Sequence, residues 1–131
     1  EEQRDQQFDS QLLLEGRRVR VLEASRHAWV ERDRHAWHKL RIAIKELRYT
    51  LDTLYPELRH AGEQATPLYS FCKQLQTGLG DWHDTVVHAS LLGGLTVSPG
   101  LESAQSHLEA RRRASLEQVM SALPEAEALL T

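Results

Sequence analysis

Apolar residues recur every three or four positions through most of the chain, and this spacing predicts an all-α fold. The clearest pattern spans residues 34–55, where one side of the predicted helix carries Ala36, Leu40, Ala43, Ile44, Leu47, Leu51 and Leu54. Residues from about 4 to 30 and from about 101 to 123 show the same period. Because short connections join these segments, we expect an antiparallel bundle of about four to six helices. It forms a single unit over residues 1–131.

Capping residues and prolines mark where the helices begin and end. Asp33 is a candidate N-cap for the helix at 34–55. Pro56 ends this helix, because proline disfavours helical geometry in the residue before it. Thr66 followed by Pro67 combines a capping residue with a first-turn proline, so we expect a third helix to begin there.

Glycines and prolines interrupt the second half of the chain. Gly78 and Gly80 predict a tight turn, after which Asp81 caps a fourth helix that ends near residue 92. Residues 93–100 are rich in glycine, serine and proline and predict a loop. The last long helix follows and stops at Pro124, beyond which we expect the tail to form a short helix or to fray.

The first and last helices each have one predicted core side. In the first helix this side carries Phe8, Leu12, Val19, Leu22 and Trp29, while Arg17, Arg18 and Arg20 point mainly away from it. In the last helix it carries Leu101, Ala104, Leu108, Leu116, Val119 and Leu123. Arg112 lies among these apolar residues, and an unpaired buried charge is very costly. We therefore expect Arg112 to meet either an acid from another helix or a bound anion.

The helix at 34–55 also carries a stripe of basic residues opposite its apolar side. The stripe consists of Arg34, His38, Arg41, Lys45 and Arg48. Like charges at this spacing repel by roughly a few tenths of a kcal/mol per pair. Glu46 points elsewhere, and Asp52 enters the stripe only near its end. The pattern fits a solvated basic face, a face paired with acids of a neighbouring helix, or a binding site for an anion.

Two motifs resemble those of a known family. The run H-K-L-R-I-A-I-K-E-L-R-Y at residues 38–49 resembles the signature helix of the CHAD family, the conserved histidine α-helical domain. The run L-G-D-W-H-D at residues 79–84, within a second motif over about 79–92, resembles the L-G-x-x-x-D that follows this signature. Together the motifs cover about residues 37–92. The resemblance implies an all-helical domain that binds inorganic polyphosphate.

The number of motifs bears on how much of the family domain is present. A full CHAD domain has two such helical repeats related by a pseudo-two-fold axis, whereas only one signature occurs here. Its K-E-L-R-Y ending resembles that of the second repeat, so the chain resembles the C-terminal half of a CHAD domain. The lack of an initiator methionine fits a fragment. We expect the chain to form a homodimer or to pair with an N-terminal half.

The resemblance also implies roles for individual residues. The candidate polyphosphate ligands are His38, Arg41, Lys45 and Arg48, which match the ligand-facing positions of the family, with Arg34 and Arg112 as further cations. Guanidinium groups bind phosphate oxygens through paired hydrogen bonds, and lysine adds a compact charge. Asp84 of the second motif would orient the basic groups; the alternative is an ion pair with His88 on its own helix. Tyr49 lies just off the stripe, where we expect it to pack.

Composition and charge limit where an anion site can lie and in which compartment the protein is expected. The chain has 131 residues and a formal net charge of −3, so any anion site must be local. A single cysteine, Cys72, excludes an intramolecular disulfide and lies in an apolar run, where we expect a buried, inert thiol and a reducing compartment. No apolar run approaches 18 residues and no signal peptide begins the chain. We therefore expect a cytoplasmic protein without a membrane segment.

Catalytic and metal chemistry find little support in the sequence. No nucleophile motif, phosphate-binding loop or pair of carboxylates suited to acid–base catalysis is visible. His35 with His38, and Asp84 with His88, each supply half of a metal site, and no set of three or four ligands is visible. We therefore predict a protein that is not an enzyme and that uses no metal or cofactor.

The leading hypothesis is a non-catalytic module that binds inorganic polyphosphate, or another phosphate-rich polyanion, through the basic stripe. The alternative is a helical interaction module whose stripe docks on an acidic protein partner. We do not expect nucleic acid as the ligand, because aromatic residues for base stacking are lacking near the stripe. Trp37 lies at its margin, and Trp29 is expected to face the core of the first helix.

Overall fold

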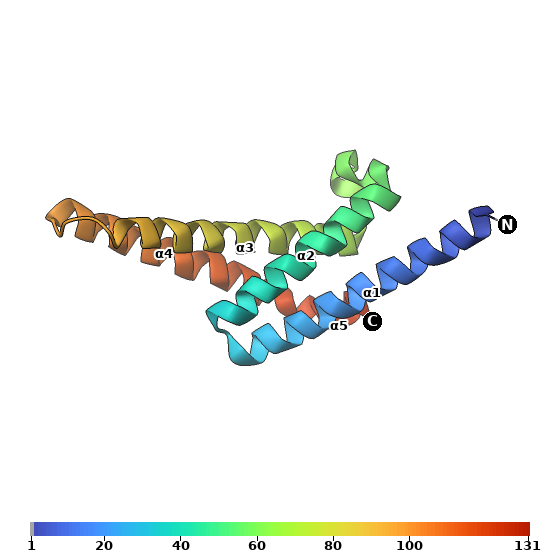
Figure 1. Ribbon diagram of the computed structural model, residues 1–131, viewed down its shortest axis with the longest axis horizontal. Helices are drawn as coiled ribbons and strands as arrows, with labels where there is room; N and C mark the ends of the chain where they lie inside the picture. The colour runs from blue at the N-terminus through green and yellow to red at the C-terminus, as the bar shows by residue number, and fades with distance from the viewer. Residues whose placement is uncertain (1) are drawn as a thin grey trace.

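The structure is a computed structural model that describes residues 2–131, with side chains described from residue 9 onward. Its α-helices are α1 (Glu2–Glu31), α2 (Arg34–Leu54), α3 (Pro67–Leu92), α4 (Pro99–Ala122) and α5 (Ala126–Leu130) (Figure 1). The 3₁₀ turns η1 (Pro56–His60) and η2 (Gly62–Gln64) connect α2 to α3, and η3 (Leu123–Glu125) connects α4 to α5. No strand occurs in the described range. The prediction of an all-α fold is confirmed.

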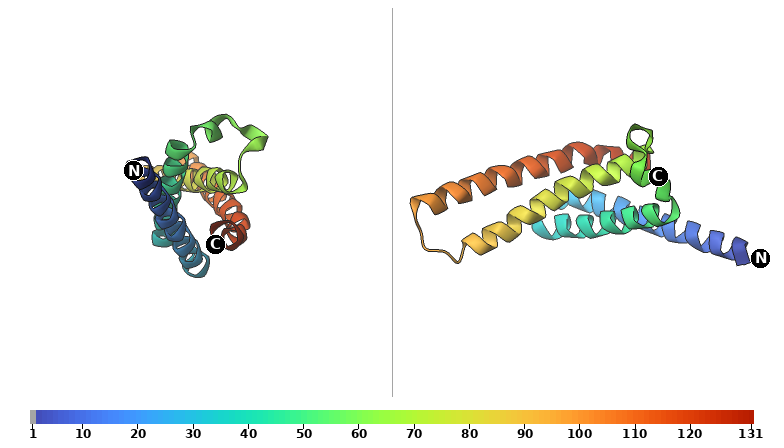
Figure 2. Two further views of the ribbon diagram at one scale, coloured as in Figure 1. Left: turned by 90° about the vertical axis from the view of Figure 1, so that its right-hand side faces the viewer. Right: turned by 90° about the horizontal axis from the view of Figure 1, so that it is seen from above.

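Two helical hairpins make up the bundle. α1 packs against α2, α3 packs against α4, and α2 also packs against α3. The short α5 returns to contact α1. The far end of the α3–α4 hairpin extends well beyond the turn between α1 and α2 (Figure 2). The predicted antiparallel helical bundle is thus confirmed, with α2 as the helix that joins the two hairpins.

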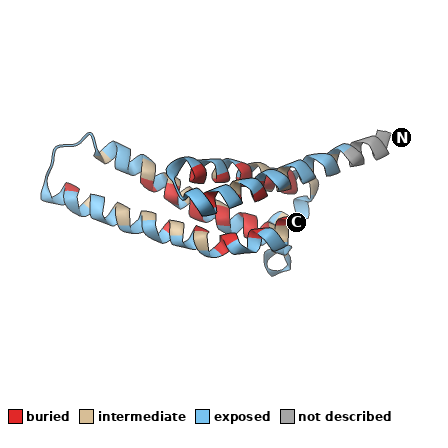
Figure 3. Cartoon of the chain, turned by 90° about the horizontal axis from the view of Figure 1, so that it is seen from below, coloured by how far each residue is buried: buried red, intermediate tan, exposed pale blue. Residues whose placement is uncertain are grey.

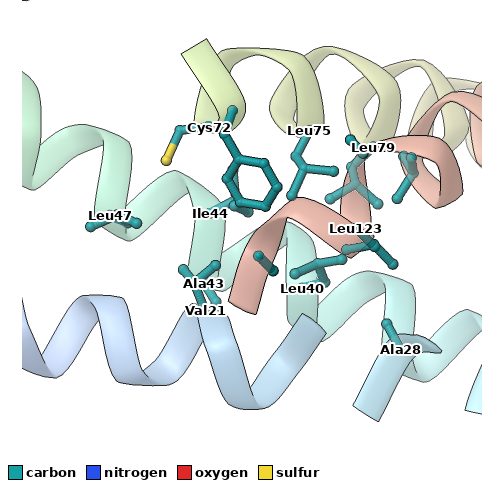
Figure 4. Close-up of a cluster of buried hydrophobic side chains, with 14 of the residues drawn as sticks. Val21, Ala28, Leu40, Ala43, Ile44, Leu47, Cys72, Leu75, Leu79 and Leu123 are labelled. Atoms are coloured by element: carbon teal, nitrogen blue, oxygen red, sulfur yellow. The ribbon is translucent and has the colours of Figure 1, made fainter. Parts of the chain in front are cut away.

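One hydrophobic core lies where the hairpins meet. Buried positions follow the inner sides of the helices (Figure 3). Side chains from all five α-helices and from η3 converge there, among them Val21, Ile44, Leu75 and Leu123 (Figure 4). Every apolar position predicted to be buried on α2 is buried, except Leu54, which is half-buried. The apolar side of α2 therefore faces the core, as its periodicity predicts.

Two further buried side chains bear on chemistry. Cys72 is fully buried, and burial raises the pKa of its thiol to about 12, so the prediction of an inert thiol is confirmed. Trp37 is also buried, so its ring cannot stack on a ligand.

None of the described helices combines the length and the apolar character that crossing a membrane requires.

The predicted helix ends are confirmed by capping hydrogen bonds. Asp33 Oδ1 accepts a hydrogen bond from the backbone N–H of Ala36 at 2.8 Å, at the start of α2. Thr66 Oγ1 accepts one from the backbone N–H of Tyr69 at 3.2 Å, at the start of α3. At its other end, α2 stops just before Pro56.

The predicted turn at Gly78 and Gly80 is wrong, and no separate helix begins at Asp81. α3 runs unbroken through all three residues. Gly78 allows α4 to approach, since a Cβ at this position would lie 2.8 Å from Val119 Cγ2. A Cβ at Gly80 would meet nothing within 4 Å. The first glycine therefore serves packing between helices, and the second leaves open space beside α3.

The predicted core side of α1 is mostly wrong. Leu12, Val19 and Trp29 are exposed, and the side chain of Phe8 lies outside the described residues. The buried positions of α1 are Val21, Leu22, Ser25 and Ala28, of which only Leu22 belongs to the predicted set. Apolar residues occur on more than one side of α1, so periodicity does not select the buried side. Packing against α2 and α5 selects it.

Two arginines of α1 also differ from the prediction. Arg17 and Arg18 are half-buried and do not point away from the core. Arg17 Nη1 donates to Glu46 Oε2 at 2.7 Å, and Arg18 Nη2 donates to the carbonyl oxygen of Leu129 at 3.2 Å. Arg20 is exposed as predicted and donates to the same Glu46 oxygen at 2.6 Å. Both ion pairs place Glu46 on the α1 side of α2, away from the basic stripe, as expected.

The predicted apolar side of α4 is buried only in part. Leu101, Val119 and Leu123 are buried, whereas Ala104, Leu108 and Leu116 are half-buried. Pro124 lies in η3, and α5 begins two residues after it. Of the two alternatives for the tail, the structure shows the short helix.

Candidate functional site

The basic stripe of α2 lies along the border between α2 and α3. At one end Arg48 contacts Gln76 of α3, and at the other His38 lines a cavity together with His83 of α3. Helical periodicity places the rest of the stripe between these two contacts. On α3, the same period places Gly80 between Gln76 and His83, where no side chain fills the space. We use the name α2–α3 groove for the surface that the stripe forms together with these three α3 residues.

The middle of the groove carries positive charge without a compensating acid. Arg41 is half-buried and Lys45 is exposed, and neither forms a hydrogen bond or an ion pair with any side chain that the structure describes. Most arginines elsewhere have partners. Arg26, for example, lies 2.5 Å from Glu127. The unpaired cations in the groove can therefore bind an anion without first breaking an ion pair.

The Arg48 end of the groove is a hydrogen-bonded network. Arg48 Nη1 donates to Gln76 Oε1 at 2.7 Å, and its Nε lies 3.9 Å from Asp52 Oδ2. The Tyr69 hydroxyl donates to Asp52 Oδ1 at 2.6 Å, and this hydrogen bond raises the pKa of Tyr69. Arg59 Nε lies 3.7 Å from the same carboxylate. Arg48 is thus oriented by its neighbours, and the Asp52 charge limits the positive region at this end.

The opposite end of the groove opens into a cavity of about 640 Å³, here called the α2 N-terminal cavity. Its lining residues are Arg34, His35 and His38 of α2 and Trp82, His83, Val86, Val87, Ser90 and Leu91 of α3. Two of the predicted ligands, Arg34 and His38, therefore lie in one cavity. It also contains two histidines that were not among the predicted polyphosphate ligands.

Arg112 does not meet an acid from another helix, which was the first of the two alternatives predicted for it. Its partner is Glu109 of its own helix, which accepts hydrogen bonds from Nε at 2.9 Å and from Nη2 at 2.6 Å. The Arg112 hydrogen bond, with a further contribution from Arg113, lowers the pKa of Glu109 to about 2. Arg112 and Arg34 line a second cavity of about 490 Å³ between α3 and α4. Arg112 therefore lies near the stripe, but Glu109 already neutralises its charge.

Neither of the two residues predicted to support the site has a side-chain hydrogen bond or ion pair with the basic stripe in the described part of the chain. Asp84 is exposed and pairs with no side chain in the described part, so the alternative of an ion pair with His88 does not form. It also lines neither cavity beside Arg34. Tyr49 is 72% exposed, so the predicted packing role is wrong.

Three residues beside the stripe were missed by the analysis of the sequence. Gln76 and His83 are two helical turns apart on α3, which places them on one side of a continuous helix. The expected break at Gly78 concealed this relationship. His35 was considered only as half of a metal site. Within the described side chains, no group of three or more His, Cys, Asp or Glu residues is arranged to bind a metal ion.

A comparison with protein families finds one match to the chain. The family model of the CHAD domain matches residues 3–93. The chain belongs to the CHAD family. The matched segment of this CHAD domain contains the whole basic stripe and the α3 side of the groove, and it leaves Arg112 outside. Comparisons with curated proteins and with solved structures give no match.

Proposed function

We propose that this CHAD domain binds inorganic polyphosphate, or a similarly phosphate-rich polyanion, in the α2–α3 groove without transforming it. CHAD domains are associated with polyphosphate binding. The observation that carries the proposal is the charge of the groove, where Arg41 and Lys45 have no acidic partner among the described residues. A polyanion supplies the negative charge that the protein itself does not place there.

The geometry of the stripe suits a linear ligand. From Arg34 to Arg48 the helix rises by about 21 Å, at about 1.5 Å per residue, with one basic residue on each turn. Phosphates at intervals along a linear chain can therefore meet successive cations. Arg48 is oriented by Gln76 before the ligand binds, which reduces the conformational entropy lost on binding. Binding also relieves the repulsion between neighbouring cations of the stripe.

The test is a change confined to the middle of the groove. Replacing Arg41 and Lys45 together with Ala should lower the affinity for long-chain polyphosphate by at least about tenfold, since two unpaired cations are lost. Wild-type affinity should also fall steeply with salt, because the ligand releases condensed counterions as it binds. Fluorescence anisotropy with a labelled polyphosphate measures both effects.

A matched control separates a specific site from net charge. Lys39 and Arg111 are exposed, unpaired among the described side chains and outside the groove, so K39A/R111A makes the same change in net charge. This control should bind nearly as well as wild type. Equal weakening of the two double variants would contradict the groove as the site. Stronger binding of an acidic polypeptide than of polyphosphate would instead favour the acidic protein partner.

A further inference from the structure

The α2 N-terminal cavity differs in chemistry from the rest of the groove. Three imidazoles, those of His35, His38 and His83, line it together with the Arg34 guanidinium. Its other lining side chains are apolar or neutral, and no carboxylate belongs to the lining. The cavity therefore gathers groups that are cationic or can become cationic, with no negative charge among them.

We propose that this cavity is a separate phosphate subsite of the groove, and that it takes up protons when it takes up phosphate. The proposal rests on the proposed function, and it concerns His35 and His83 in particular. The occupant is a stretch of the same polyanion that the stripe binds. Its affinity rises as the pH falls through the range in which the imidazoles gain a proton.

The chemistry of imidazole supports this coupling. Histidine changes its charge between about pH 5 and pH 8, and an imidazolium ion has two N–H donors and no acceptor. Protonated His35 and His83 can therefore both donate to phosphate oxygens. In the absence of an anion they would repel Arg34 and each other across the cavity. Phosphate between them removes this repulsion, so protonation and phosphate binding strengthen each other.

The position of the cavity at the start of α2 favours an anion independently. Arg34 and His35 belong to the first turn of the helix, where unpaired backbone N–H groups and the helix dipole give a partial positive charge. The Asp33 side chain caps one of these groups, the N–H of Ala36. Other first-turn N–H groups point toward the same end of the helix as the histidines.

No carboxylate of the neighbouring elements lines the cavity, and the nearest one along the chain, Asp33, caps the first turn of α2. On α3, Asp81, Asp84 and His88 are exposed and do not line it. On α4, Glu109 and Arg112 line the adjoining cavity with Arg34 and pair with each other.

The Glu109 pair stays ionised throughout the relevant pH range. The pKa of Glu109 lies at about 2, so the stability that its ion pair contributes is present above the ordinary glutamate pKa. That contribution is lost only as the pH falls below about 4.5 toward 2. Between pH 5.5 and pH 8, a change in affinity therefore cannot come from Glu109.

The experiment measures affinity against pH at constant ionic strength. Wild-type protein should bind long-chain polyphosphate about tenfold more tightly at pH 5.5 than at pH 8, which corresponds to an average net uptake of about 0.4 proton over this range. A parallel series with dextran sulfate, whose charge does not change in this range, should show the same trend. Calorimetry in two buffers with different ionisation enthalpies counts the protons taken up directly.

Histidine variants test whether the protons that are taken up on binding go to the cavity. H35Q/H83Q should lose most of the pH dependence, because glutamine cannot gain a proton in this range. The control H60Q/H107Q also removes two histidines, neither of which lines the groove or the cavity, and it should retain the wild-type profile. Circular dichroism at each pH verifies that the variants keep their helix content.

The outcomes distinguish this inference from the proposed function. Binding with the same pH profile in wild type and H35Q/H83Q would overturn the inference and leave the groove as the polyphosphate site. Equal weakening of H35Q/H83Q at every pH, without a change of slope, would also overturn proton uptake by the cavity. No binding of polyphosphate by the wild type at any pH would overturn the proposed function itself.

Discussion

Glu109 controls how much positive charge Arg112 offers to a ligand. The two side chains share two hydrogen bonds on α4, and Arg113 Nε lies 3.2 Å from the same Glu109 carboxylate. Because Arg112 shares a cavity with Arg34, a polyanion that reaches the end of the stripe meets this carboxylate. At the scale of single residues, the stripe is thus bounded by an acid at each end, Glu109 near Arg34 and Asp52 near Arg48.

Removing the carboxylate of Glu109 should therefore strengthen binding. We expect Glu109→Gln to raise the affinity for polyphosphate by about two- to fivefold at low salt, a modest gain because exposed charges are screened. Titration of labelled polyphosphate measures the change. Glu117→Gln removes the same charge from an exposed, unpaired position of α4 and should have a smaller effect. An unchanged affinity in E109Q would show that the ligand does not extend to Arg112.

At the scale of helices, one glycine determines how closely α3 and α4 pack. A Cβ at Gly78 would lie 2.8 Å from Val119 Cγ2 and 3.4 Å from the carbonyl oxygen of Ser115. A valine methyl and a backbone oxygen cannot easily move aside in a packed interface. Gly80, a half-turn further along the helix, has no such neighbour. Substitutions at the two glycines are therefore expected to have opposite effects on stability.

Gly78→Ala should destabilise the protein, because overpacking costs about 1–3 kcal/mol and outweighs the gain in helix propensity. Gly80→Ala should instead raise the free energy of unfolding by about 0.5–1 kcal/mol, since alanine favours the helix and meets open space. Thermal and urea unfolding followed by circular dichroism measure both. Equal changes in the two variants would contradict the close approach of α3 and α4 at Gly78.

At the scale of the whole molecule, apolar side chains remain exposed along the far part of the α3–α4 hairpin. These are Val87, Leu91, Leu95 and Val97, with exposures of 42%, 68%, 60% and 77%. Exposed apolar surface of this kind favours association. Val87 and Leu91 also line the α2 N-terminal cavity, so a second copy that covers them would lie beside bound phosphate. Homodimer formation, which the sequence analysis predicts, remains a prediction.

Added polyphosphate should increase the dimer fraction, because it neutralises the two stripes that a dimer brings together. Sedimentation at fixed ionic strength measures this fraction. Replacing Leu91 and Leu95 with Gln should lower it, whereas Leu12→Gln, at an exposed apolar position of α1, should not. A monomer at high protein concentration, with and without polyphosphate, would show that these apolar residues do not mediate self-association.

The sequence by itself determined the helix that carries the candidate site. In α2 the apolar residues repeat on a single side, Asp33 caps the start, and Pro56 follows the end. Each of these features acts within a few residues of the chain, so the sequence is enough to detect it. Helical periodicity within α2 also predicted that Glu46 lies away from the basic stripe, and Glu46 pairs with Arg17 on the other side of α2. Glu109, three residues before Arg112, was also detectable in this way.

Only the tertiary structure decided which surfaces meet. The buried side of α1 depends on α2 and α5, because α1 has apolar residues on several sides. The role of Gly78 depends on Val119, which lies far along the chain. The histidine-lined cavity likewise requires the start of α2 to lie beside the second half of α3. Periodicity describes each helix alone, whereas a groove or cavity depends on the distance and angle between helices, which core packing sets.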